Sequence, residues 1–243
     1  MRPLTAKELL QVWEQGIAQP PVWKALGLLA AATPEMSLEQ LSVLPIGQRN
    51  GRLLTLREWT FGSHIESVAN CPHCGEVLEL NFTINDIRVD PALVAETDLQ
   101  LERAGYRVHY RLPNSQDLEL VGAYTDPLKV QAIILSRCLL EVFAPSEAAE
   151  TTLPDEVKDA VVAAMVKHDP QADIELALTC SACEHPWTVG FDIVTFFWHE
   201  INTWARRLLW DIHRLARVYG WSESEILALS PLRRQFYLEM VDP

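Results

Sequence analysis

Two short motifs, Cys71-Pro-His-Cys74 and Cys180-Ser-Ala-Cys183, stand roughly a hundred residues apart in this chain of 243 residues. An ungapped alignment of residues 71–84 with 180–193 superimposes both cysteines, one aromatic residue and one isoleucine, namely Phe82 on Phe191 and Ile84 on Ile193. Each motif therefore predicts a tight cysteine-bearing turn, here called a knuckle, that leads into a strand. Two knuckles supply four thiolates, which is the ligand set of a closed structural zinc site.

Other uses of these cysteines remain open at this stage. Disulfides would require an oxidising compartment, and the N-terminal residues 1–6 show no secretory signal pattern. A thioredoxin-like redox role for one motif would leave the other unexplained. The fifth cysteine, Cys138, lies in an apolar run and is expected in the core. His73 lies between the two cysteines of the first motif, and His185 lies two residues after the second motif. Either is an alternative ligand, although exposed turn positions suit both better.

The charge of the chain is concentrated in its middle. Residues 71–190 contain eight Lys or Arg and 20 Asp or Glu, so this segment accounts for nearly all of the net charge of −13. Such a surface repels phosphate backbones, which argues against a nucleic-acid partner. The acidic segment is either a solvated face or a surface for a basic partner. No apolar run is long enough to cross a bilayer, so no membrane association is expected.

The patterns predict an α+β fold that is predominantly helical, with a zinc-ribbon-like element built from the two knuckles and short strands. We expect an N-terminal helical segment (1–70), an acidic α+β segment bounded by the knuckles (71–190) and a C-terminal helical segment (191–243). Together they would form one compact unit with residues 85–170 as an insertion.

Capping signals place the individual elements. Capping boxes at Thr5 and Ser37 predict two of the N-terminal helices, with a third over 22–32. In the block 44–62, Arg57 and Glu58 are expected on an exposed helix face. The middle segment predicts strands over 77–84 and 172–179 beside the knuckles, a hairpin around Ala104-Gly105, helices over 116–124, 128–143 and 154–168, and a loop over 144–152.

Tryptophan is concentrated near the C-terminus, where five of the eight lie between Trp187 and Trp221. Apolar residues recur every three or four positions from 192 to 219, which predicts one long helix that ends at Gly220. Two shorter helices follow over 223–229 and 232–241. The tryptophans suit a core, but part of this aromatic surface is also a candidate interface. The candidate partner-binding residues are Trp204, Trp210, Trp221, Arg233 and Arg234.

Sequence motifs of catalysis are absent. The stretch from His199-Glu200 resembles the start of a zinc-protease helix, but Thr203 stands where the second histidine belongs. No nucleophile elbow, phosphate-binding loop or dinucleotide fingerprint occurs. We therefore expect that the protein is not an enzyme.

Three blocks together resemble a known family, the T-even-type phage baseplate hub assembly chaperones and baseplate proteins. They are Leu44-Pro-Ile-Gly to Phe61-Gly leading into the first knuckle, Asp169-Pro-Gln-Ala-Asp leading into the second, and the ending Leu215-Ala-Arg-Val-Tyr-Gly-Trp-Ser to Arg233-Arg-Gln-Phe-Tyr-Leu. The resemblance is spread over most of the chain, and its ending is the most specific part.

The resemblance implies a role in building the baseplate of a contractile phage tail or bacterial contractile injection system, with no chemistry of its own. The charge distribution and the sequence ending favour a non-catalytic assembly chaperone as the leading hypothesis. Its partners would be baseplate or hub proteins, and it would reside in the cytoplasm of the producing cell or on the particle. A structural subunit retained in the particle is the first alternative. A zinc-ribbon nucleic-acid binder is another, which the net charge disfavours. The oligomeric state, and the choice between phage and bacterial injection system, stay open.

Overall fold

The computed structural model describes residues 1–89, 99–145 and 153–241. Helix accounts for 56% and strand for 18%, the strands lying in small sheets, so the predicted α+β class is confirmed. The chain forms two compact units, one of residues 1–33 with 194–243 and one of residues 34–193. The three-segment division, drawn from charge and knuckle positions, stays a prediction.

The first unit is helical. It contains α1 (Ala6–Gly16), α2 (Pro21–Ala32), α9 (Ile193–Tyr219, whose first residue belongs to the other unit), α10 (Glu223–Ala228) and α11 (Pro231–Val241). The capping box predicted at Thr5 is present, as is a second one at Ser222. Helix α1 packs so closely on α9 that a Cβ at Gly16 would overlap the Trp198 ring. The Trp13 indole N–H, in turn, donates to Asn202 Oδ1 at 3.1 Å.

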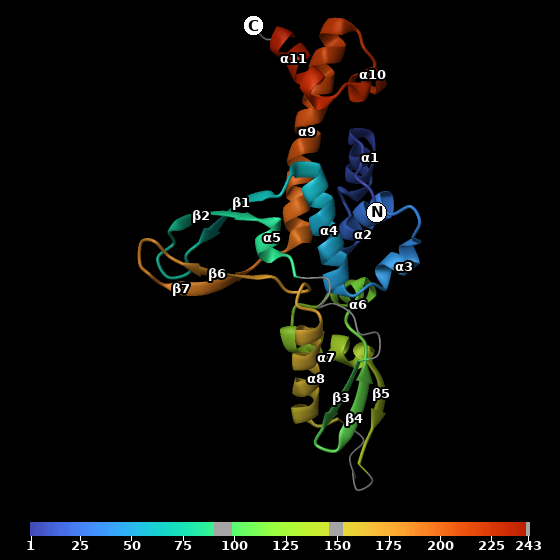
Figure 1. Ribbon diagram of the computed structural model, residues 1–243, viewed down its shortest axis with the longest axis vertical. Helices are drawn as coiled ribbons and strands as arrows, with labels where there is room; N and C mark the ends of the chain where they lie inside the picture. Colours follow the sequence, from blue (N-terminus) through green and yellow to red (C-terminus); the bar gives the residue numbers. More distant parts are fainter. Residues whose placement is uncertain (90–98, 146–152, 242–243) are drawn as a thin grey trace. The chain divides into compact units, whose positions relative to one another are not determined.

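Helix α9 shows the predicted apolar stripe. Its buried residues recur at helical spacing, and from residue 194 on they are Val194, Phe197, Ile201, Ala205, Leu208, Ile212 and Leu215. The helix ends at Gly220, whose φ of +70° is the left-handed conformation expected there. The chain then folds back, and the Trp221 ring stacks on Tyr219 with centroids 4.5 Å apart. Tyr237 of α11 meets both rings edge-on, which ties α11 to the end of α9 (Figure 1).

The second unit is mixed. Its helices are α3 (Leu38–Ser42), α4 (Ile46–Phe61), α5 (Ile84–Ile87), α6 (Ser115–Val121), α7 (Pro127–Cys138) and α8 (Asp155–His168). Among the described residues of this unit, the strands form two two-stranded antiparallel hairpins and one three-stranded antiparallel sheet. The hairpins are β1 (His64–Asn70) with β2 (Val77–Thr83), and β6 (Glu175–Thr179) with β7 (Pro186–Gly190); the sheet is β3 (Leu99–Arg103), β4 (Tyr106–Tyr110) and β5 (Leu139–Phe143).

Helix α4 corrects the exposed position expected for Arg57. Leu53, Leu54 and Leu56 are all fully buried, so more than one side of the helix is covered. Arg57 was predicted on an exposed face and is instead 2% exposed, with its Nη1 donating to the Gly62 carbonyl at 2.8 Å. The prediction was wrong because the guanidinium satisfies a backbone carbonyl at the helix end, which a periodicity argument cannot see.

The three-stranded sheet corrects a second prediction. The helix expected over 128–143 ends at Cys138, and residues 139–143 form β5. This stretch pairs with β4, with Val142 opposite Val108, so tertiary pairing overrides the helical pattern. The core under the sheet is apolar and includes Val108, Tyr110, Cys138, Val157 and Val161. Cys138 is fully buried, as predicted, while the loop expected over 144–152 lies mostly outside the described residues.

One buried carboxylate ties the loop after β4 to α6 and α7. Asp117, whose side chain is fully buried, accepts from Arg111 Nη1 at 2.6 Å and from Arg137 Nε at 2.7 Å. The backbone N–H of Asn114 also donates to it at 3.0 Å. Burial alone would raise the pKa of Asp117. The hydrogen bonds from Arg111, Arg137 and the Asn114 backbone outweigh this effect and lower the pKa to about 2.

Replacing the Asp117 carboxylate is expected to destabilise the folded protein. Asp117→Asn should lower the free energy of unfolding by about 3 kcal/mol, because two guanidinium groups lose their counter-charge. The folded pKa is depressed, so the stabilisation is present above the ordinary Asp pKa of about 3.9 and is lost as pH falls toward about 2. Urea unfolding between pH 7 and 2 checks both statements. Glu102→Gln, which removes an exposed ion pair with Arg107, serves as control and should cost less than about 1 kcal/mol.

A buried polar cluster, here called the clasp, joins the N-terminal end of α4 to the chain that leaves α8. The Gly47 N–H donates to Asp169 Oδ2 at 2.9 Å, and Asn50 Nδ2 donates to the Gln171 carbonyl at 3.2 Å. Gln171 also binds the chain after α5, since its Oε1 accepts a hydrogen bond from the Val89 N–H at 2.7 Å. The clasp therefore fastens the start and the end of the segment between the hairpins to one helix.

The clasp predicts opposite effects for two glycines of α4. A Cβ at Gly47 would overlap Asp169 Oδ1, so Gly47→Ala should lower the free energy of unfolding by about 2 kcal/mol. A Cβ at Gly51 meets open space, so Gly51→Ala should raise it by about 0.5–1 kcal/mol through helix propensity. Thermal and urea unfolding of both variants measure the difference. Equal effects at the two positions would contradict the clasp.

Candidate metal centre

The two knuckles lie at the turns of the two hairpins. Strand β1 pairs with β2 from His64 opposite Thr83 to Asn70 opposite Val77. Strand β6 pairs with β7 from Glu175 to Thr179 in the same antiparallel manner. Figure 1 shows the hairpins side by side as one arm, and the Phe82 and Phe191 rings meet edge-on at 5.6 Å. Strand β1 was not predicted, although its alternating pattern and the strand before the second knuckle were signals for it.

The knuckles share one backbone geometry. In the first, the Cys71 N–H donates to the Glu76 carbonyl at 2.8 Å and the Gly75 N–H donates back to the Cys71 carbonyl at 2.9 Å. In the second, Cys180 and His185 make the same contact at 3.0 Å, and the Glu184 N–H donates to the Cys180 carbonyl at 2.9 Å. The residue after the second cysteine has positive φ in both, +77° at Gly75 and +58° at Glu184. A non-glycine residue in this conformation indicates that the turn itself is required.

The hairpins bring all four predicted ligands together. The sulfur atoms of Cys71, Cys74, Cys180 and Cys183 lie within 4.8 Å of one another. The two shortest separations cross between hairpins, 3.7 Å from Cys71 to Cys183 and 3.6 Å from Cys74 to Cys180. These distances are too long for disulfides. They match the roughly 3.8 Å between sulfur atoms around a tetrahedral metal with bonds of about 2.3 Å.

The protonation of the thiols also favours a cation at the centre. Burial raises the pKa of Cys71, but the backbone N–H groups of Cys74 and His73 point at its sulfur, and the pKa falls to about 7. At Cys183 the His185 N–H lowers the pKa, yet burial and the three neighbouring thiols outweigh it, and the pKa rises to about 12. One thiolate therefore forms readily, while four in this space require a compensating positive charge.

The two histidines of the knuckle regions, His73 and His185, lie beside the cluster. The His73 and His185 rings stack on each other with centroids 5.3 Å apart. Neither contributes to the group of ligand atoms that lie within 4.8 Å of one another. Within the described residues, the cysteines thus form a complete four-sulfur set without a histidine.

The candidate partner-binding residues all lie in the first unit but differ in exposure. Trp210 is 67% exposed on α9, whereas Trp204 and Trp221 are partly buried. On α11, Arg233 is exposed and Arg234 is 9% exposed. Burial lowers the pKa of Arg234, and the nearby carboxylate of Asp211 on α9 partly offsets this effect. Arg234 is therefore used within the unit, beside α9. Trp210 and Arg233 are therefore the members of the set that are open to a partner.

Comparison with known families matches residues 28–198 to the model described as T4 bacteriophage base plate protein. The chain belongs to this T4 base plate family. The match includes both knuckles and the clasp, and it confirms the resemblance noted from the sequence. Comparisons of this base plate protein with curated proteins and with solved structures gave no match. None of its described helices has the length and apolar character needed to span a membrane.

The sulfur cluster predicts one bound metal ion per chain. Chelation should lower the melting temperature, because the ion joins hairpins that are distant in sequence and its binding free energy contributes to folding. Cys180→Ser should lose the ion and the stability, and elemental analysis with thermal unfolding measures both. Cys138→Ser, which changes a thiol buried elsewhere, is the matched control and should keep the ion. A metal-free wild-type protein that is insensitive to chelators would contradict the site.

Proposed function

We propose that this protein is a non-catalytic assembly chaperone for the baseplate of a contractile phage tail or bacterial contractile injection system. The family match supports a role in the base plate. The observation that favours a transient role is the hairpin arm: residues 64–83 and 174–190 contain five Glu and no Lys or Arg. A surface of one sign keeps a protein soluble and in solution until an oppositely charged partner arrives.

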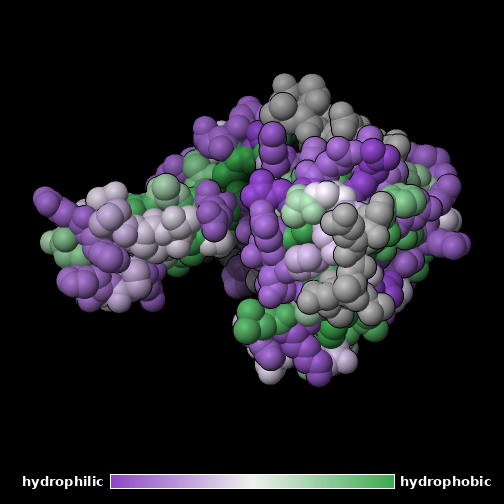
Figure 2. All heavy atoms as spheres, turned by 90° about the horizontal axis from the view of Figure 1, so that it is seen from below, coloured by the Kyte–Doolittle hydropathy of each residue, from purple (hydrophilic) through white to green (hydrophobic). Residues whose placement is uncertain are grey.

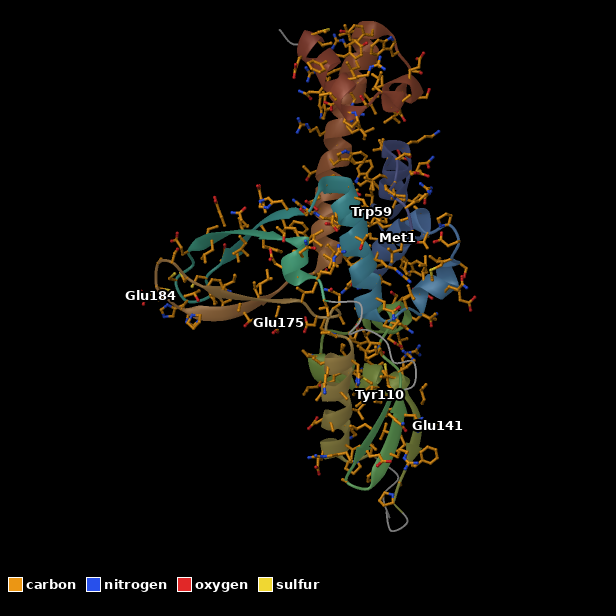
Figure 3. All side chains as sticks on the ribbon, viewed as in Figure 1. Met1, Trp59, Tyr110, Glu141, Glu175 and Glu184 are labelled. Atoms are coloured by element: carbon orange, nitrogen blue, oxygen red, sulfur yellow. The ribbon has the colours of Figure 1, made fainter. Side chains whose placement is uncertain are left out.

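The metal in this proposal is a structural zinc ion. Four cysteine sulfurs at tetrahedral spacing form the donor set that zinc prefers, and they leave no coordination position for a substrate. Zinc would join the two hairpins at the knuckle end of the arm. Figure 3 places Glu184 at that end and Glu175 near the other, and in Figure 2 hydrophilic residues gather at the outer end of the arm. The arm would therefore present a rigid acidic surface rather than a reaction centre.

The buried polar residues support a protein without chemistry of its own. Asp117 is neutralised by two arginines, and Asp169 and Gln171 hold the clasp. Burial raises the pKa of Asp169, and the Gly47 N–H and Arg49 partly offset this effect. The carboxylate accepts a hydrogen bond at the N-terminal end of α4, where a negative charge is stabilising. These groups are used in structure, which is the pattern of an interaction protein.

Quantitative mass spectrometry of purified particles and of the lysate that produced them tests the chaperone role. An assembly factor should be abundant in the lysate and absent from the particles, with a tail-tube protein as the stoichiometric reference. Fixed copies per particle would instead establish a structural subunit.

A complementation assay adds a second readout. Cells that lack the chain should fail to complete baseplates, Cys138→Ser should restore them, and Cys180→Ser should not. Restoration by both variants would show that the metal centre is dispensable.

A further inference from the structure

The outward face of α9 has an unusual composition. Opposite the buried stripe, residues at helical spacing place an exposed tryptophan among basic side chains: Arg206, Arg207, Trp210, His213, Arg214 and Arg217. Trp210 is 67% exposed, and its ring meets His213 edge-on with centroids 6.0 Å apart. An open depression of about 420 Å³ lies beside it, lined by Arg206, Leu209, Trp210 and His213. We call this surface the Trp210 face.

Its charge is positive in a chain that is otherwise acidic. Residues 203–217 contain four arginines and one carboxylate, Asp211, against a net charge of −13 for the whole chain. Asp211 lies close enough to the partly buried Arg234 of α11 to interact with it. Among the described residues, no carboxylate forms an ion pair with Arg206 or Arg217. Asp211 also interacts with Arg207 and Arg214. The guanidinium groups that the Trp210 face offers to a partner are therefore those of Arg206 and Arg217.

This combination differs from an ordinary solvated helix face. Solvated faces mix both charges and seldom carry a large aromatic ring, whereas Trp and Arg are the residues that dominate binding energy at interfaces. A tryptophan ring can bury roughly 150–250 Å² on contact with a partner. The arginines around it would supply orientation and attraction at a distance.

We propose that the Trp210 face binds an acidic amphipathic segment of a partner protein. An apolar side chain of that segment would occupy the depression beside Trp210, and its carboxylates would pair with Arg206 and Arg217. Because the face is basic, a segment rich in Asp or Glu is its electrostatic complement. The proposal rests on the proposed function, since it takes the partner to be a base plate component. Nucleic acid is disfavoured because the remainder of the chain repels phosphates.

Binding of designed peptides to the purified full chain tests this. The probe is a fluorescein-labelled helical peptide of about 14 residues, long enough for four turns, with Leu on one face and Glu on the other. Its counterpart keeps the Leu positions and carries Lys in place of Glu, and a short DNA duplex is the third ligand. Anisotropy titrations at two salt concentrations should show binding of the Glu peptide that weakens with salt, and little binding of the other two.

Variants locate the binding surface. Trp210→Ala should weaken binding of the Glu peptide about 30-fold, the loss typical of an interface hot spot. The double variant Arg206→Glu with Arg217→Glu should weaken it at least as much. Leu232→Ala removes an equally exposed apolar side chain from α11, and Lys7→Glu reverses an exposed charge on α1; both should bind as the wild type does. Circular dichroism confirms that every variant is folded.

Three results would overturn the proposal. One is equal binding of the Glu and Lys peptides, and another is tighter binding of the DNA duplex, which would make the face a nucleic-acid surface. The third is self-association of the wild type, seen in sedimentation, that Trp210→Ala abolishes, since the face would then bind a second copy. These outcomes are independent of whether the chain remains in particles, so failure here is distinguishable from failure of the chaperone role.

Discussion

The convergence of four thiols from residues 71–74 and 180–183 is the constraint on which the second unit depends. An isolated two-stranded hairpin is marginally stable in water, because it buries too little apolar surface. Here two such hairpins share a seam that includes the ring contacts of Phe82 with Phe191 and of His73 with His185. A metal among the sulfurs would supply the cross-link that this seam lacks, and it would close a loop of about a hundred residues. The entropy cost of that closure grows only slowly with loop length.

The clasp complements this cross-link at the other end of the arm. Asp169 and Gln171 fasten the returning chain to α4, and Gln171 also holds the departing chain at Val89. The intervening segment, with its own core under the three-stranded sheet, is thereby fixed at its base without any covalent link. This explains why Asn50 on α4 and the residues Asp169 and Gln171 after α8 are buried although they are polar. Each pays for its burial with a specific hydrogen bond.

The features predicted correctly from sequence are those set by local chemistry. The knuckles, the capping boxes at Thr5 and Ser37 and the helix stop at Gly220 depend on residues close together in the chain. The errors share an opposite cause. Residues 139–143 form a strand because they pair with the edge of β4. Arg57 can be buried because its guanidinium donates a hydrogen bond to the Gly62 carbonyl. Sequence periodicity reports the preferred face of an element, but not the neighbour that completes it.

The candidate site was predictable for a related reason, while the clasp was not. Cysteine pairs are recognisable in a sequence, because a set of thiols with fixed spacing has few structural uses. The clasp is made of Gly, Asp, Asn and Gln, which occur in any loop, and only the fold shows that Gly47 must be small because Asp169 lies against it. The same holds for the Trp210 face, whose arginines look unremarkable in sequence. They become an interface candidate once the helix assigns Trp210 and Arg206 to the outer side and leaves the apolar stripe to the core. Acidic arm and basic helix face thus give one chain two surfaces of opposite sign, and each selects a partner segment that the other repels.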